Sequence, residues 1–207
     1  MNQELPRLLV GDLVFIRVRA PLFRQIAAAT GSWTNHVGIV IALEGEQAIV
    51  AESAIPWSRL TPLRRFAARS VGGRIAVARC AAPLSAEQER NLRRAAVARL
   101  GILYDLGFDL NSRRQFCSKF VRQIMQEALG VTLGETQDFA ALRAARPDTP
   151  LAYWKFWYLG RIPWQRVTIT PAAVLASPQL RIVFDGCLPH GGAARGRPAA
   201  VSAAIVR

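Results

Sequence analysis

The feature that most constrains the fold is a pair of β-rich runs joined by a short polar connection. Residues 36–43, "HVGIVIAL", and residues 47–53, "QAIVAES", flank Glu44-Gly45-Glu46. Both runs contain mainly strand-forming residues, and glycine in a three-residue connection is typical of a hairpin. We therefore predict an antiparallel β-hairpin.

The pairing of this hairpin brings two polar side chains together. With a three-residue loop, Leu43 pairs with Gln47, and Gly38 lies opposite Glu52. His36 is then the diagonal neighbour of Glu52 on the same face, about 7 Å away at the backbone and within side-chain reach. A two- or four-residue loop would place them on opposite faces, because a one-residue slip reverses every side chain. Gly38 between them leaves room for the imidazole.

A second pattern places a cysteine at the start of a helix. From Cys117 the apolar residues recur at the three-and-four spacing of one helix face, and Gly130 provides a stop signal. A helix N-terminus lowers the pKa of a thiol, since its free N–H groups and dipole favour the thiolate. A cysteine nucleophile also needs a base, and the base needs a third group that fixes its tautomer. Cys117, His36 and Glu52 are the candidates.

Each of the three residues also has a structural explanation. A lone histidine at a strand start is commonly part of the core, a lone cysteine on an apolar helix face is usually packing, and Glu52 at a strand end is normally a solvated rim residue. Their coincidence, each at the end of its element, favours a catalytic site.

The remaining elements complete an α+β pattern. Strands are expected at residues 11–18, 73–80 and 179–185, and a loop or short helix at residues 21–35. Ser85 and Gln88 form a capping box for a helix that runs to about Leu100. Thr136 is expected to cap a short helix through Arg143, and Thr170-Pro171 to begin another.

Composition sets the broad class. At 207 residues and 51% apolar, the chain fits one domain, which we assign to residues 1–187, and the low-complexity residues 188–207 are expected to be a disordered tail. The net charge of +13 comes from scattered arginines with no basic block, which argues against a specific nucleic-acid function. No signal peptide or membrane span is recognisable, so we expect a cytoplasmic protein.

The cysteines argue against other chemistries. Cys80, Cys117 and Cys187 form no CxxC pair, and their odd number in a reducing compartment argues against a disulfide framework. The chain's two histidines and three cysteines lie far apart without ligand spacing, so neither a metal site nor a cofactor is expected. "CLPH", residues 187–190, lies where no element would fix its geometry.

A family resemblance rests on an ordered set of motifs. "GDLVF", "NHVGIVI", "VAES", "YDLGFD" and "FCSKFV", followed by "WKFWYLGRIPW" and "TPA", span residues 8 to 184. This order resembles the circularly permuted papain-like, NlpC-type hydrolases of the YaeF/YiiX (peptidase C92) group, with closest likeness to the uncharacterised YebB-type proteins. In the unpermuted fold the cysteine helix precedes the strands, whereas here the histidine strand comes first.

The resemblance implies a fold and a set of roles. The fold would be an antiparallel sheet or half-barrel packed against helices, with Cys117 as nucleophile, His36 as base and Glu52 as third member. Tyr104 is similar to a tyrosine that helps to hold the oxyanion, although a core aromatic explains it equally well. Further substrate-binding candidates are Trp33 and Ser32, just before His36, and Asp12 of "GDLVF".

The implied reaction is acyl transfer through a thioester. A cysteine amidase or peptidase-like hydrolase is the first expectation, and a lipid-directed acyltransferase or thioesterase with the same residues is the second. The third is a binding module without activity. The substrate would be a small peptide, an amide or a lipid acyl group. The aromatic and basic residues 153–166 could pack over the core, line the substrate site or contact a membrane surface.

Overall fold

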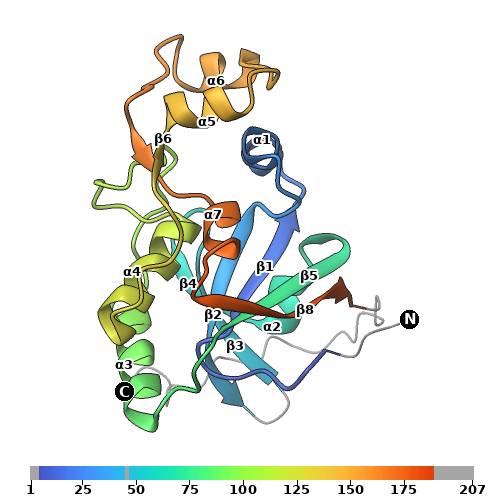
Figure 1. The fold of residues 1–207 in the computed structure, drawn as a ribbon, viewed down its shortest axis with the longest axis vertical. Coiled ribbons are helices and arrows are strands. Elements are labelled where there is room, and N and C mark those ends of the chain that lie inside the picture. Colours follow the sequence, from blue (N-terminus) through green and yellow to red (C-terminus); the bar gives the residue numbers. More distant parts are fainter. Residues whose placement is uncertain (1–4, 45–46, 189–207) are drawn as a thin grey trace.

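The fold is built around one antiparallel sheet (Figure 1). The computed structural model describes residues 5–44 and 47–188. The sheet has six strands in the order β4-β3-β2-β1-β5-β8, and a second sheet pairs β6 with β7. The strands are β1 (Leu13–Val18), β2 (His36–Glu44), β3 (Gln47–Ser53), β4 (Ser58–Pro62), β5 (Ser70–Cys80), β6 (Gln137–Asp138), β7 (Val167–Thr168) and β8 (Leu180–Cys187).

Helices cover both faces of the large sheet. They are α1 (Pro21–Thr30), α2 (Leu63–Ala67), α3 (Ala86–Val97), α4 (Cys117–Leu129), α5 (Phe139–Ala145), α6 (Ala152–Trp157) and α7 (Pro171–Leu175). Phe15 of β1 belongs to the core cluster that includes α3 and α4, whereas its neighbours Val14 and Ile16 pack with Phe66 of α2. This alternation of side chains along a strand lets one sheet serve two cores. The predicted α+β class is confirmed.

The connection of the β2–β3 hairpin is shorter than predicted. Glu44 pairs with Gln47, so the strands are joined by two residues, and the prediction of a three-residue loop is wrong. Those two residues lie outside the described part of the chain. With regular pairing from that turn, His36 and Glu52 would lie on opposite faces.

A β-bulge restores the register that the site needs. The pairing shifts by one residue between Val40 and Ala42, so that Val40 pairs with Val50 and Ile39 with Ala51. Beyond the bulge the register is therefore the predicted one, and His36 shares its face with Glu52. A bulge adds one residue to one strand, which compensates for the shorter connection.

Local sequence signals identify most helix ends correctly. Ser85 and Gln88 form both hydrogen bonds of the capping box at α3, and α4 begins at Cys117 and stops before Gly130, which has a left-handed φ of 69°. Thr170 caps α7 as expected. The predicted cap of α5 is wrong, because Asp138 and not Thr136 accepts a hydrogen bond from the helix, at 2.7 Å from the nitrogen of Ala141.

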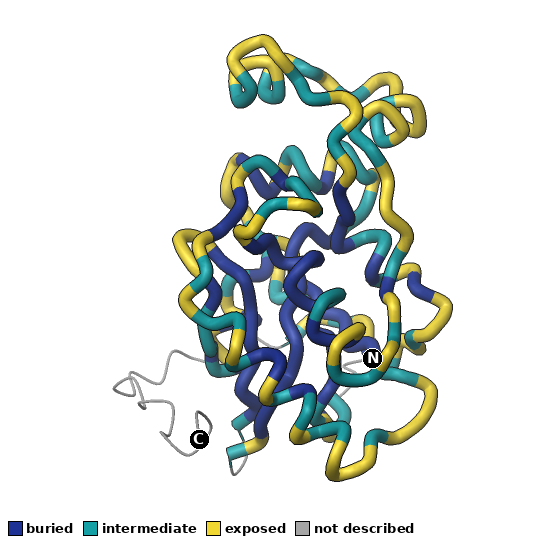
Figure 2. The backbone as a smooth tube through the Cα atoms, turned by 90° about the vertical axis from the view of Figure 1, so that its left-hand side faces the viewer, coloured by how far each residue is buried: buried dark blue, intermediate teal, exposed yellow. Residues whose placement is uncertain are grey.

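Residues 139–166, which include α5 and α6, form a lobe that stands away from the sheet (Figure 1). The chain in this lobe is half-buried or exposed, unlike the buried strands (Figure 2). Neither α5 nor α6 contains a fully buried residue. Among the described residues, no helix is long and apolar enough to cross a membrane. The predicted disordered tail falls almost entirely on residues 189–207, outside the described part of the chain.

Gly38 on β2 provides the first testable prediction. A Cβ atom there would lie 2.5 Å from Val50 Cγ1 and 2.9 Å from Phe66 Cε2, so the space beside Gly38 is used by these side chains and not by the imidazole as predicted. We expect Gly38→Ala to lower the free energy of unfolding by about 1–3 kcal/mol through overpacking, measured by urea denaturation. Gly186→Ala is the control, because its nearest neighbour is the tip of the Phe184 ring at 3.0 Å. Equal costs for both variants would contradict this account.

Candidate active site

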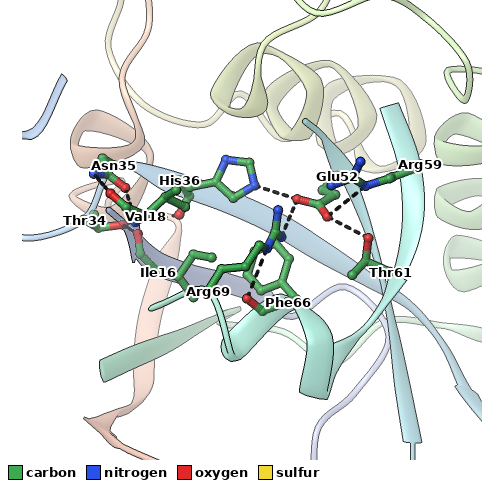
Figure 3. Close-up of polar contacts among 10 residues, drawn as sticks. All are labelled: Ile16, Val18, Thr34, Asn35, His36, Glu52, Arg59, Thr61, Phe66 and Arg69. Atoms are coloured by element: carbon green, nitrogen blue, oxygen red, sulfur yellow. Dashed lines mark hydrogen bonds and ion pairs between the residues drawn. The ribbon is translucent and has the colours of Figure 1, made fainter. Parts of the chain in front are cut away.

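The first part of the site is a buried histidine–carboxylate pair (Figure 3). His36 begins β2, and Glu52 lies near the end of β3. The His36 Nε2 atom donates to Glu52 Oε2 at 2.7 Å, and the two residues are 1% and 0% exposed. The proximity predicted from strand pairing is therefore confirmed. This contact fixes the ring so that Nδ1 is free to face another group.

The Glu52 carboxylate has further partners from neighbouring elements. Thr61 Oγ1 donates to Oε1 at 2.6 Å, and Arg69 Nη2 donates to Oε2 at 2.7 Å. Arg59 Nε lies 3.6 Å from Oε1. Burial raises the pKa of Glu52, but hydrogen bonding and charge from His36, Arg69 and Thr61 outweigh burial and lower the pKa to about 2. Glu52 is therefore a fixed negative charge at neutral pH.

Aromatic rings hold the imidazole in its plane. The Phe66 ring stacks on His36 with a centroid distance of 5.5 Å, and Phe23 meets it edge-on at 5.6 Å. The guanidinium of Arg69 lies 4.9 Å from the Phe66 ring centre. Phe66 thus supports both the histidine and the arginine that share Glu52. The ring of His36 is fixed by packing as well as by its hydrogen bond.

Cys117 begins α4 beside this pair and is 2% exposed. Burial raises the pKa of its thiol, but the positive charge of His36 and the backbone N–H groups of Val37 and Ser118 outweigh burial and lower it. Burial likewise lowers the pKa of His36, and the Cys117 and Glu52 charges outweigh it and raise that pKa to about 9. The favoured state is thus a thiolate beside an imidazolium.

Two polar atoms at Cys117 are left without a partner. Nδ1 of His36 and the hydroxyl of Tyr104 are buried and have no hydrogen-bond partner among the described residues. Charge and side-chain hydrogen bonding between Cys117 and His36 both contribute to their pKa shifts, although no hydrogen bond of ordinary geometry reaches Nδ1. Burial and the nearby Cys117 charge raise the pKa of Tyr104, so its hydroxyl keeps its proton. Buried polar atoms are normally paired, and two unpaired ones beside a thiolate indicate a place for a reacting group.

The segment before α4 is fixed by side chains that bind its backbone. Lys119, which is buried, donates to the carbonyls of Ser112 and Arg114, the latter at 2.9 Å. Asp105 accepts from the N–H groups of Gly107 at 2.8 Å and Asp109 at 3.0 Å. These contacts hold the loop that leads into α4, and they set the position of Cys117.

An apolar pocket reaches Cys117. Its walls come from α1, the segment before α4, the α5–α6 lobe and the segment before α7, and they include Ile26, Tyr104, Phe108, Leu142, Trp154 and Ile169. Arg143 and Arg146 of the lobe also line it. The aromatic residues of the lobe are therefore partly a wall of this pocket, as one of the sequence interpretations held.

Three of the predicted substrate-binding residues lie elsewhere. Trp33 packs under the guanidinium of Arg74, whose carbon is 4.2 Å from its ring centre, and Ser32 Oγ accepts from Thr34 N–H. Asp12 is fully buried in an ion pair with Arg79 at 2.7 Å. Neither Trp33 nor Ser32 lines the pocket that reaches Cys117, and the carboxylate of Asp12 has a structural role. Position near a motif was a poor guide to these three.

The other cysteines do not join the site. Cys80 is half-buried at the end of β5, and Cys187 is exposed at the end of β8. His190 of the "CLPH" sequence lies outside the described residues. Tyr104, by contrast, lines the pocket together with Cys117. The residues that the structure brings together are Cys117, His36, Glu52 and Tyr104.

Comparison with known proteins agrees with this geometry. Residues 7–184 match the family described as permuted papain-like amidase enzymes, YaeF/YiiX, C92 family. The chain belongs to this family. It is 32% identical to the uncharacterised protein YiiX of Escherichia coli K12 over 173 residues, which are 84% of either chain. The crystal structure of YiiX from Escherichia coli O157:H7 superposes with a TM-score of 0.79 at 31% identity and covers 86% of this chain and 98% of that one. The closer likeness to YebB-type proteins stays a prediction.

That crystal structure describes the E. coli O157:H7 protein as a metalloprotein. In this chain, Glu52 already binds His36, Thr61 and Arg69. The described residues also hold no group of three histidine, cysteine, aspartate or glutamate side chains arranged to bind a metal ion. The candidate site therefore does not fit a resident metal.

Sequence reasoning missed the residues that support the pair. Thr61, Phe66 and Arg69 come from β4, α2 and the residues between α2 and β5, none of which was predicted. The five residues of β4, "SRLTP", include only one β-branched residue and end in proline, so they carry little strand signal. One arginine among the chain's many carries no signal of its own.

The support that Arg69 gives to Glu52 can be tested. The lowered pKa of Glu52 contributes stability that is fully present above about pH 4.5 and is lost as pH falls toward 2. We expect Arg69→Met to lower the free energy of unfolding at pH 7 by about 1.5–3 kcal/mol, since it removes a hydrogen bond to a buried charge. The cost should shrink in urea titrations at pH 3.

Arg59→Met is the matched control, because this arginine is more exposed and more distant from the carboxylate. It should cost about 1 kcal/mol or less. A cost for Arg69→Met that is the same at pH 7 and pH 3 would mean that Arg69 acts through packing on Phe66 and not through Glu52.

Proposed function

We propose that this chain is a cysteine-dependent amidase with Cys117 as nucleophile, His36 as acid and base, and Glu52 as the group that orients and charges His36. The observation that carries the proposal is the buried Cys117 thiol whose lowered pKa follows from His36, with two unpaired polar groups beside it. Membership in the papain-like amidase family supports the reaction class.

The first half of the reaction forms a thioester. The Cys117 thiolate attacks the carbonyl carbon of the amide, and the carbonyl oxygen takes the negative charge. The Tyr104 hydroxyl and the first N–H of α4 are the donors available to this oxyanion. The carbon–nitrogen bond then breaks, and the proton on His36 Nδ1 passes to the leaving amine.

The second half releases the acid. His36, now neutral, accepts a proton from water as the water oxygen attacks the thioester carbon. The carbon–sulfur bond breaks, Cys117 leaves as a thiolate, and His36 is again an imidazolium. Glu52 stays ionised throughout, because its pKa of about 2 lies far below the working range. Its role is to hold the Nε2–H and to stabilise the charge on the ring.

The lining of the pocket indicates which part of the substrate binds there. A mainly apolar and aromatic wall next to the nucleophile favours an apolar acyl group, with the amide placed at Cys117. An acyltransferase or thioesterase would use the same residues, and no described contact selects a second acceptor in place of water. Hydrolysis of an N-acyl amide is therefore the proposed activity.

The experiment is an amide hydrolysis screen with N-acyl amides of graded chain length, followed by intact-protein mass spectrometry. We expect an acyl adduct on Cys117 and a loss of kcat by about 10⁴-fold or more in Cys117→Ala. Tyr104→Phe should lower kcat by about 100-fold with little change in KM. Cys80→Ala and Cys187→Ser are the matched thiol controls and should keep activity. An acyl adduct that persists in Cys117→Ala would refute the assignment.

The charge state gives a pH prediction. Between pH 8 and pH 6 the iodoacetamide labelling of Cys117 should slow less than that of an ordinary thiol, which with a pKa of about 8.5 slows about 100-fold, because the pKa of Cys117 is lowered. In His36→Ala the labelling should fall steeply at pH 6, because only the backbone N–H groups of Val37 and Ser118 then oppose the rise in thiol pKa caused by burial. Amide turnover should decline as pH rises through about 9, where His36 loses the proton that the leaving amine needs.

The control for labelling is a Cys80→Ala/Cys187→Ser background, in which Cys117 is the sole thiol. The same steep pH dependence with and without His36 would show that the imidazole does not act on Cys117. Normal labelling without any amide turnover would indicate the inactive binding module.

A further inference from the structure

The short helix α6 is apolar on two opposite faces. Trp154 and Tyr158, four residues apart, line the pocket that reaches Cys117. On the other side, Phe156 of α6 and Leu159 in the turn after it are 79% and 88% exposed. A helix of a soluble protein normally places polar residues on its outer face. The outer face of α6 therefore has an apolar surface that the described part of the chain does not cover.

The turn that ends α6 presents Leu159 at a conformational cost. Leu159 has a φ of 50° and is followed by Gly160 with a φ of 82°. A left-handed conformation is unusual for a leucine, and such strain is commonly found at functional sites. No burial compensates for it, since Leu159 is among the most exposed large apolar side chains described. The turn directs an apolar side chain outward.

The charge around this face has one sign. Lys155 and Arg161 are exposed on either side of Phe156 and Leu159. In residues 139–166 as a whole there are five basic side chains and one acidic one, Asp148. Exposed apolar residues flanked by cations and tryptophans suit the headgroup region of an anionic bilayer, where apolar groups enter the acyl boundary and cations meet phosphates.

We propose that the α5–α6 lobe docks on an anionic lipid surface, with Phe156 and Leu159 inserted and Lys155 and Arg161 on the headgroups. The docking itself is independent of catalysis. The value of docking for catalysis rests on the proposed function. The opposite face of the same helix lines the pocket at Cys117, so an amide carried by a lipid would enter the pocket there. A membrane-embedded acyl chain would match the apolar lining of that pocket.

The test is flotation of the full chain with large unilamellar vesicles. One set contains phosphatidylcholine alone, and the other contains about 30% phosphatidylglycerol as the anionic lipid. We expect binding to the anionic vesicles that weakens with salt. Phe156→Ser/Leu159→Ser should lower the partition coefficient by about tenfold or more, because two large side chains lose their insertion. Lys155→Glu/Arg161→Glu should abolish the preference for anionic vesicles.

Ile182→Ser is the matched control, since Ile182 is an exposed apolar residue on β8, away from the lobe. It should bind vesicles like the unchanged chain. Equal partitioning of the Phe156→Ser/Leu159→Ser variant and the unchanged chain would overturn the proposal. A second result would also overturn it: the unchanged chain forms a dimer in light scattering, and the double variant loses the dimer but keeps its vesicle binding. The exposed apolar face would then bind a second copy of the chain and not a lipid surface.

Iodoacetamide labelling of Cys117 and hydrolysis of a soluble short-chain amide separate the two proposals. Both should be unchanged in Phe156→Ser/Leu159→Ser, which leaves every pocket residue in place. Vesicle binding should be unchanged in Cys117→Ala. Vesicle binding without hydrolysis supports docking while the proposed function fails, and hydrolysis without vesicle binding overturns docking alone.

Discussion

The buried carboxylate of Glu52 is the interaction on which the site depends. An ionised carboxylate without partners is too costly to bury, so the elements around it must each supply a donor. His36 comes from β2, Thr61 from β4, and Arg69 from the residues between α2 and β5, at 2.7, 2.6 and 2.7 Å. The Glu52 charge can therefore be buried only if β2, β3 and β4 lie side by side and the residues after α2 reach the carboxylate.

Charge alternates from Arg69 through Glu52 and His36 to Cys117. Each member is stabilised in its charged form by the next, which is how a thiol that is almost fully buried keeps a lowered pKa. The first N–H groups of α4 end this series. The sheet contributes the charge pair and the helix contributes the nucleophile, so the site exists only where the two layers meet. The apolar pocket on the lobe side of Cys117 reaches this meeting point.

Local signals in the sequence were sufficient for part of this arrangement. The start of α4 at Cys117 and the capping box at Ser85 depend on neighbours within a few residues, and both were predicted correctly. The His36–Glu52 contact was also predictable, because strand pairing in the hairpin connects the two residues. Arg69 was not, since it lies in no strand and one arginine resembles another. Asp12 was misassigned for the same reason, since a motif does not reveal that its carboxylate pairs with Arg79, 67 residues away.

The bulge in β2 separates the geometry of the hairpin tip from that of the site. The error in the predicted loop length had no effect on the face assigned to His36, because the extra residue between Val40 and Ala42 cancels it. His36 and Glu52 share a face as long as the number of residues between them stays even or odd as it is now. Those residues can be divided between the turn and the bulge in different ways. Loop length is thus a misleading guide to homologous positions in such hairpins. Two relatives could differ in their turns and still superpose their histidine and glutamate, provided that a gain in one place is matched by a loss in the other.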